Sequence, residues 1–97
     1  MTAFRITPRA ARDLDGIARW TLRNWGADRM EAYLRSLNDR FLWLAQNPQT
    51  GRDRADVAKG YRSFPEGRHL IFYLIGSDHI AIIGLPHQAM DAGMYFG

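Results

Sequence analysis

Cysteine is absent from this sequence of 97 residues. Neither a disulfide framework nor a zinc-thiolate site can therefore compensate for a small hydrophobic core. A chain of this length buries only about 60 to 65% of the surface that its unfolded form exposes, so every apolar face must be used or covered. Hydrophobic packing has to hold the fold, helped where necessary by a partner chain.

Long apolar runs are also missing. No stretch approaches the ~20 apolar residues that a membrane helix requires, and residues 1–5 lack the apolar segment of a secretory signal. We therefore expect a cytoplasmic protein that has no contact with a membrane. Because the composition does not change abruptly along the chain, we expect one domain over residues 1–97.

Lysine is nearly absent, since Lys59 is the only lysine among 13 basic residues and the others are arginine. Arginine forms two-pronged bonds to carboxylate or phosphate and loses its water more easily than lysine, which suits interfaces. A GC-rich genome would produce the same bias. The arginine content, with a formal net charge of +3, does not decide between these explanations.

Motifs of catalysis and of metal binding are missing too. No glycine-rich phosphate loop follows a predicted strand, which argues against a nucleotide-binding enzyme. His69, His79 and His87 do not have the spacing of a metal site, and no base-nucleophile pair is recognisable. We therefore predict no catalytic residue, no metal ion and no cofactor, and we interpret the histidines as hydrogen-bonded structural residues.

Apolar periodicity predicts two consecutive helices after a short strand at residues 4–6. The first helix covers residues 8–25, with Thr7 as its N-cap and Gly26 as its stop. The second begins near Asp28, which has Glu31 three residues later, and ends before Pro48. Two adjacent amphipathic helices joined by a very short turn predict an antiparallel hairpin. The carboxylates Asp13, Asp15, Asp28 and Glu31 are assigned to first helical turns, where they favour the positive end of the helix dipole.

Three strands are predicted in the second half, at residues 61–64, 68–75 and 79–85, with turns at 65–67 and 76–78. Residues 49–59 are expected to form a surface loop. The order β-α-α-β-β-β predicts an α+β fold, in which an antiparallel sheet carries the helix hairpin on one face.

Both faces of the predicted sheet are apolar, although the helices can cover only one. A partner chain could cover the second face, or residues 88–97 and the long loop could fold over it. On strand 68–75, one face carries Leu70, Phe72 and Leu74, and the other carries His69, Ile71, Tyr73 and Ile75; on strand 79–85, Ile80 and Ile82 oppose Ala81, Ile83 and Leu85.

Aromatic and basic residues supply the candidates for binding. Trp20 and Trp43 fall away from the apolar stripes and could anchor an interface, whereas Trp25 fits the core of the hairpin. Arg62 and Arg68 give the start of the sheet a positive charge that could attract phosphate or acidic groups. Solvated charges on an exposed hairpin are the commoner explanation of the same arginines.

Five segments, taken in order and spacing, resemble the RelE/ParE toxin superfamily over nearly the whole chain, and the ParE branch fits best. They are TPRAARDLD (7–15), NWG (24–26), NPQTG (47–51), RHLIFY (68–73) and LPHQAMD (85–91). The resemblance implies the toxin of a bacterial type II toxin-antitoxin module, of the kind that stabilises plasmids. A ParD-like antitoxin would wrap the toxin with its C-terminal segment, and operator DNA would be bound only through the antitoxin.

ParE toxins are associated with inhibition of DNA gyrase, so the resemblance implies a non-enzymatic toxin. Two alternatives remain open, a ribosome-dependent endoribonuclease and a non-toxic chain that only binds antitoxin. The sequence departs from the superfamily at Gly84, where both branches often have arginine, and at His69-Leu70, where an arginine is expected. Pro86 also departs from the ParE pattern and should end the last strand at about Leu85.

The resemblance and the residue pattern together assign two sets of contact residues. The antitoxin-binding set contains Trp20, Trp43, Phe64, His69, Ile71, Tyr73 and Ile83. The target-binding set contains Arg62, Arg68, His87, Met90, Met94, Tyr95 and Phe96.

Overall fold

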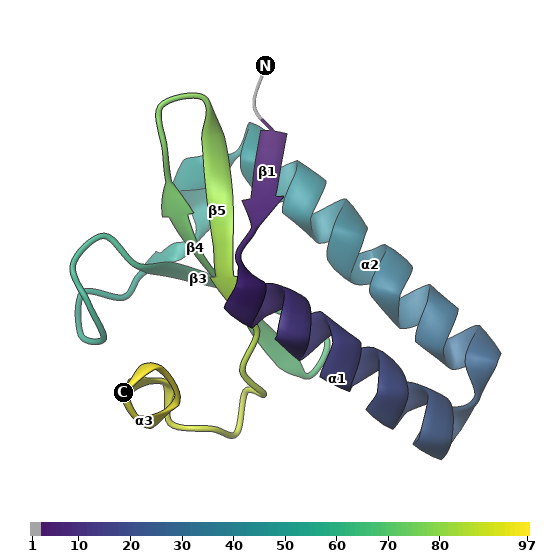
Figure 1. Ribbon diagram of the computed structural model, residues 1–97. Helices are drawn as coiled ribbons and strands as arrows, with labels where there is room; N and C mark the ends of the chain where they lie inside the picture. Colours follow the sequence, from purple (N-terminus) through teal and green to yellow (C-terminus); the bar gives the residue numbers. More distant parts are fainter. Residues whose placement is uncertain (1–2) are drawn as a thin grey trace.

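A computed structural model describes residues 3–97 and contains a helix hairpin on one side of a five-stranded sheet (Figure 1). Within these residues, no helix is both long enough and apolar enough to cross a membrane. In chain order the elements are β1 (Ala3–Ile6), α1 (Pro8–Trp25), α2 (Ala27–Gln46), the 3-10 helix η1 (Pro48–Thr50), β2 (Arg52–Asp53), β3 (Arg62–Glu66), β4 (His69–Ile75), β5 (His79–Gly84) and α3 (Ala92–Phe96).

The helix ends follow the capping rules, with one correction. The Thr7 side chain accepts the Ala10 N–H at 3.3 Å and starts α1, as predicted. Gly26, at φ 91°, both ends α1 and precedes the first residue of α2. α2 begins at Ala27, one residue before the predicted Asp28, so a single glycine makes the whole connection and Asp28 lies in the first turn rather than at the cap.

The α+β fold and the predicted element order are confirmed, but the sheet is mixed, in the order β1-β5-β4-β3-β2. β1 pairs with β5 in parallel, so the expectation of a fully antiparallel sheet is wrong. Both helices and three strands separate β1 from β5, which is ample chain for a parallel crossover. Two further differences are β2, inside the predicted loop, and the extension of β3 through Glu66, so that the turn falls at Gly67.

The hydrophobic core lies between the hairpin and one face of the sheet. Phe41 of α2 packs edge-on against Phe4 of β1, with ring centroids 5.4 Å apart. Tyr73 is fully buried there, and its hydroxyl donates to the Pro48 carbonyl at 2.7 Å and accepts the Gly51 N–H at 2.8 Å. The remaining fully buried large side chains of this core are Leu37, Leu44, Ile71, Ile80 and Ile82.

The outer face, meaning the sheet face opposite the helices, is covered in part by the chain itself. Phe72 is fully buried, with its ring 5.0 Å from Phe96 of α3 and 6.4 Å from Tyr61. A Cβ on Gly84 would lie 2.9 Å from the Tyr95 ring and 3.1 Å from the Phe96 ring. Glycine at this position therefore admits α3 to the sheet. The sequence allowed either a partner chain or the chain's own tail and loop to cover this face. In the structure, the tail and the loop provide part of the cover.

A register shift at Phe72/Tyr73 changes the facing of the last residues of the sheet. Leu85 was expected on the outer face beside Ile83, but it is buried in the core under the helices. The extra residue of the bulge reverses the alternation after Ile83. Ile83, Leu70 and Leu74 remain half-buried.

Replacing Tyr73 by phenylalanine should lower the free energy of unfolding by about 1–3 kcal/mol, because the Gly51 N–H would be left buried without an acceptor. Urea denaturation followed by circular dichroism measures this. Tyr61→Phe is the matched control, since no hydrogen bond of the Tyr61 hydroxyl appears among the described residues. Equal stabilities for the two variants would contradict the role given to the Tyr73 hydroxyl.

Candidate binding groove

Both helices extend past the end of the sheet at the hairpin tip (Figure 1). Side chains near the tip therefore have no sheet beneath them, and Trp20 and Trp25 are 47% and 50% exposed. The exposure predicted for Trp20 is confirmed. The assignment of Trp25 to the hairpin core is wrong, because its helical stripe continues beyond the surface that it was expected to cover.

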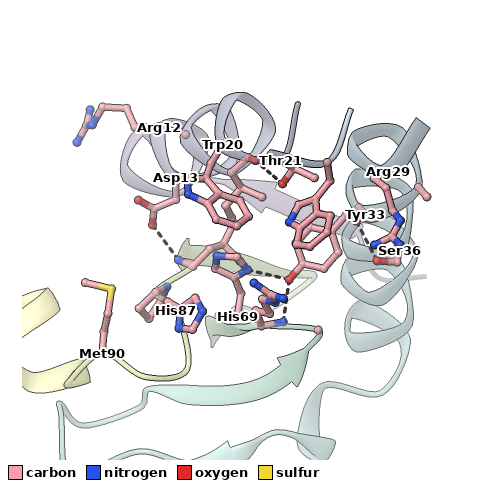
Figure 2. Close-up of a pocket in the computed structure, with 18 of the residues that line it drawn as sticks. Arg12, Asp13, Trp20, Thr21, Arg29, Tyr33, Ser36, His69, His87 and Met90 are labelled. Atoms are coloured by element: carbon pink, nitrogen blue, oxygen red, sulfur yellow. Dashed lines mark hydrogen bonds between the residues drawn. The ribbon is translucent and has the colours of Figure 1, made fainter. Parts of the chain in front are cut away.

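A groove of about 850 Å³ lies between the hairpin, the β3-β4 turn and the segment that follows β5 (Figure 2). Aromatic rings and histidines meet in it from three different parts of the chain. Its lining includes Arg12, Asp13, Ile17, Trp20, Thr21, Trp25, Arg29, Tyr33, Arg68, His69, Leu85, Pro86, His87, Met90 and Tyr95.

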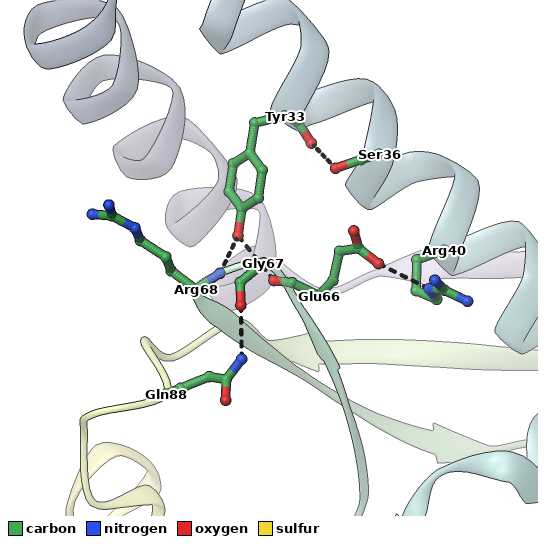
Figure 3. Close-up of polar contacts among 7 residues, drawn as sticks. All are labelled: Tyr33, Ser36, Arg40, Glu66, Gly67, Arg68 and Gln88. Carbon is green, nitrogen blue, oxygen red and sulfur yellow. Dashed lines mark hydrogen bonds and ion pairs between the residues drawn. The ribbon is translucent and has the colours of Figure 1, made fainter.

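The Tyr33 hydroxyl joins the two walls of the groove. It donates to the Glu66 carbonyl at 2.9 Å, accepts the Arg68 N–H at 3.1 Å and lies 2.7 Å from His69 Nδ1. Gly67 at the turn, with φ 56°, has no Cβ that would collide with the Tyr33 ring (Figure 3). One side chain of α2 therefore fixes the position of the β3-β4 turn.

Two further contacts hold the same turn (Figure 3). Gln88 Nε2 donates to the Gly67 carbonyl at 2.8 Å, and Arg40 Nε pairs with the Glu66 carboxylate at 2.9 Å. The Arg40 ion pair is partly shielded from solvent, so it is screened less than a fully exposed pair. The β3-β4 turn, which forms one side of the groove, is thus linked by polar contacts to α2 and to the segment after β5.

His69 lies against His87 on the neighbouring segment, with ring centroids 5.5 Å apart. Burial, and then the charge that His87 can carry, lower the pKa of His69 to about 4. The His69 imidazole is therefore neutral at pH 7, and it is bonded to Tyr33. A packed, hydrogen-bonded imidazole of this kind matches the structural role that we predicted for it.

Asp13 has a different role from the one predicted. It lies beyond the first turn of α1, and its carboxylate accepts the Leu85 N–H at 2.9 Å and the Tyr95 hydroxyl. Burial, and then the Asp13 carboxylate, raise the pKa of Tyr95. Arg9 adds a bond from Nη1 to the Tyr95 carbonyl at 3.3 Å. These contacts hold α3 against the sheet, so the expected helix-dipole role of Asp13 is wrong.

In the structure, the residues predicted to bind the antitoxin and those predicted to bind the target do not form two separate surfaces. Trp20 and His69, assigned to the antitoxin, share the groove with Arg68, His87, Met90 and Tyr95, assigned to the target. Ile71 and Tyr73 are fully buried under the helices, so their assignment as antitoxin contacts is wrong for this conformation.

The remaining predicted residues lie elsewhere. Trp43 packs on Phe64 with ring centroids 5.3 Å apart, in a second aromatic cluster away from the groove. Arg62 Nη1 donates to the Gly51 carbonyl at 2.6 Å, so this arginine supports the chain after α2. Phe96 packs on the outer face, whereas Met94 is 84% exposed.

Sequence reasoning missed Asp13, Trp25, Arg29 and Tyr33 as groove residues. Of these residues, only Trp25 could have been recognised from the sequence. A tryptophan next to the glycine of a hairpin tip is poorly placed for burial. Asp13 and Tyr33 make their contacts across more than 30 residues of chain, which no local pattern reports.

A helix hairpin on a mixed five-stranded sheet, with an aromatic groove at the overhanging end, defines a small α+β protein with a fold of the RelE/ParE type. The model of the family of ParE toxins of the type II toxin-antitoxin system parDE matches residues 4–92. The chain therefore belongs to the ParE toxin family.

Individual relatives support this assignment. Toxin ParE1 of Caulobacter vibrioides is 32% identical over 97 residues, covering 100% of both chains. Toxin ParE of Escherichia coli is 30% identical over 92 residues, covering 94% of this chain and 89% of that one. A chain of the chromosomal ParDE TA system from P. aeruginosa has the same fold, with a TM-score of 0.75 at 19% identity, covering 90% of this chain and 96% of that one.

The low pKa of His69 predicts a pH dependence of folding. Unfolded His69 takes up a proton near its ordinary pKa of 6.5, whereas the folded chain does so only near 4, so stability should fall as the pH drops from 6.5 to 4. His69→Gln removes this component, and the stability difference between the wild-type chain and this variant should shrink over that range. Denaturation at several pH values measures it, and an imidazole NMR titration of His69 with a midpoint near 6.5 would refute it.

Proposed function

We propose that this chain is a non-enzymatic toxin that inhibits DNA gyrase by binding it, and that a ParD-like antitoxin neutralises the chain by occupying the groove. Membership of the ParE toxin family is the observation that carries the proposal. The solved relative belongs to a ParDE system, which supports an antitoxin of the ParD type as the partner.

The outer face argues against the ribonuclease alternative. Ribonucleases of the superfamily cut messenger RNA with basic residues, and a tyrosine or histidine, on the exposed sheet face and the tail. Here Tyr95 and Phe96 lie over Gly84, and Phe96 covers Phe72. Arg54, which lies over the Phe72 ring, forms two parallel bonds to the Asp56 carboxylate at 3.0 and 3.1 Å. Its positive charge is therefore paired within the chain.

The groove suits a bound polypeptide because its tryptophan rings are open to solvent. Trp20 and Trp25 present large apolar surfaces at low entropic cost, which is typical of interface anchors. The contacts of Tyr33 and Asp13 hold the walls before a partner arrives, so little ordering is needed on binding. An antitoxin segment in the groove would also cover His87 and Met90, and would thereby block target contacts there.

We assign part of the gyrase contact to the exposed methionines of the tail. Met94 projects from α3 and is 84% exposed, and Met90 is 51% exposed at the edge of the groove. Methionine adapts to varied apolar surfaces, which suits a contact with a larger partner. Tyr95 and Phe96 then serve to hold α3 in place.

A supercoiling assay with purified DNA gyrase tests this function. The chain should inhibit supercoiling, and a ParD-like antitoxin, to be sought in the neighbouring reading frame, should restore activity when added in equal amount. In cells, induction should activate the DNA-damage response and leave messenger RNA intact. Cleaved messenger RNA with unimpaired gyrase would establish the ribonuclease alternative, and normal growth would establish the non-toxic one.

Met94→Glu should reduce gyrase inhibition at least tenfold, because a charged group would have to be desolvated at an apolar contact. Leu42→Glu is the matched control, because Leu42 is 45% exposed on α2, away from the tail. This variant should inhibit gyrase like the wild-type chain. Equal inhibition by both variants would remove Met94 from the contact. Deleting residues 88–97 is less informative, because it would also uncover Phe72.

A further inference from the structure

Two arginines lie against Trp25 at the open end of the groove. The guanidinium carbon of Arg29, in the first turn of α2, is 5.3 Å from the centroid of the indole ring. The guanidinium carbon of Arg68, from the β3-β4 turn, is 6.0 Å from the same ring. Arg29 comes from the hairpin that also carries Trp25, whereas Arg68 comes from a distant part of the chain, and both guanidinium groups lie near this one exposed ring.

Neither guanidinium has a carboxylate partner within residues 3–97, where the ion pairs involve Arg19, Arg40, Arg54 and His79. Arg12 adds a third positive charge to the lining. The lining contains one carboxylate, Asp13, and both the Leu85 N–H and the Tyr95 hydroxyl are bonded to it. The groove therefore presents positive charge that the described part of the chain does not neutralise.

The scaffold restricts where these charges can be. Tyr33 holds the backbone N–H of Arg68 at 3.1 Å, and the backbone of Arg29 is held in the first turn of α2. Stacking on an aromatic face further limits the rotamers of each guanidinium. A planar guanidinium held in this way loses little further freedom when it forms two parallel bonds to a carboxylate.

We propose that Arg29 and Arg68, stacked on Trp25, form a carboxylate-binding subsite of the groove that takes an aspartate or glutamate side chain from an amphipathic segment of the antitoxin. This inference rests on the proposed function. The apolar lining beside the subsite, which includes Ile17, Leu85 and Pro86, fits the apolar side chains of the same segment. The apolar lining and the two arginines together favour a segment that carries both acidic and apolar residues.

The polypeptide occupant is favoured over nucleic acid by this lining. A groove for single-stranded nucleic acid combines ring stacking with a positive track that follows many phosphates. Here two of the three arginines of the lining lie near one ring, and aliphatic side chains such as Ile17 and Leu85 also line the groove. A single charged group next to an apolar surface is the chemistry that this arrangement matches.

The test uses the whole chain and the ParD-like antitoxin sought in the neighbouring reading frame, with affinity measured calorimetrically at low and moderate salt. Arg29→Gln and Arg68→Gln should each weaken binding about tenfold and reduce its salt dependence, since each removes one charged contact. Arg35→Gln is the matched control, because Arg35 is an exposed arginine of α2 outside the groove lining. It should bind within about twofold of the wild-type chain.

A second measurement identifies the carboxylate. Each acidic residue in the C-terminal segment of the antitoxin is replaced by its amide, and one replacement should weaken binding of the wild-type chain about tenfold. The same replacement should have little further effect on the Arg29→Gln or Arg68→Gln chain, because the coupled partner is already missing. Thermal unfolding of each variant at the wild-type temperature shows that the fold is retained.

The subsite would be overturned if the Arg29→Gln and Arg68→Gln chains bound the antitoxin with wild-type affinity. It would also be overturned if the effects of toxin and antitoxin replacements were strictly additive in every pair. Either result would leave the proposed function intact. If the variants lost affinity for a 12-nucleotide single-stranded DNA and kept their affinity for the antitoxin, the subsite would be one for phosphate and the proposal would fail. A wild-type chain that did not bind the antitoxin would overturn the proposed function itself, and the subsite with it.

Discussion

The Tyr33 hydroxyl is the contact on which the geometry of the groove depends. The overhanging part of the hairpin and the β3-β4 turn form two sides of the groove, and Tyr33 connects them. Three polar contacts to one hydroxyl, at 2.7 to 3.1 Å, make this connection. Tyr33 is half-buried, so these bonds are partly protected from competing water.

The tail illustrates how a small domain completes its own core. Gly84 leaves room for Tyr95 and Phe96, and the bonded Asp13 carboxylate ties the end of the chain to α1. The sequence left open whether a partner chain or the chain itself covers this face of the sheet, and the tail supplies part of the cover. Exposed apolar surface remains at the groove, where Trp20 and Trp25 are 47% and 50% exposed.

The position of the groove bears on how a toxin and its inhibitor can be related. Residues that the sequence divided between antitoxin and target, such as His69 and His87, face one another across 5.5 Å. A surface this small cannot be shared by two large partners at once. On the proposed function, an antitoxin segment in the groove would block the target contacts of His87 and Met90 without a conformational change in the toxin.

By itself, the sequence determined the element order, the limits of α1 and the residues available for a core, since capping residues and apolar periodicity act over a few neighbouring positions. It also marked both sheet faces as apolar and Trp20 as exposed. Only the tertiary structure decided what covers each face, that β1 runs parallel to β5, and that a bulge turns Leu85 inward. Likewise, helical spacing placed Trp25 on the apolar face of α1 but could not report that the sheet ends before reaching it. Periodicity specifies a direction from the helix axis, and only the packed chain determines whether anything lies in that direction.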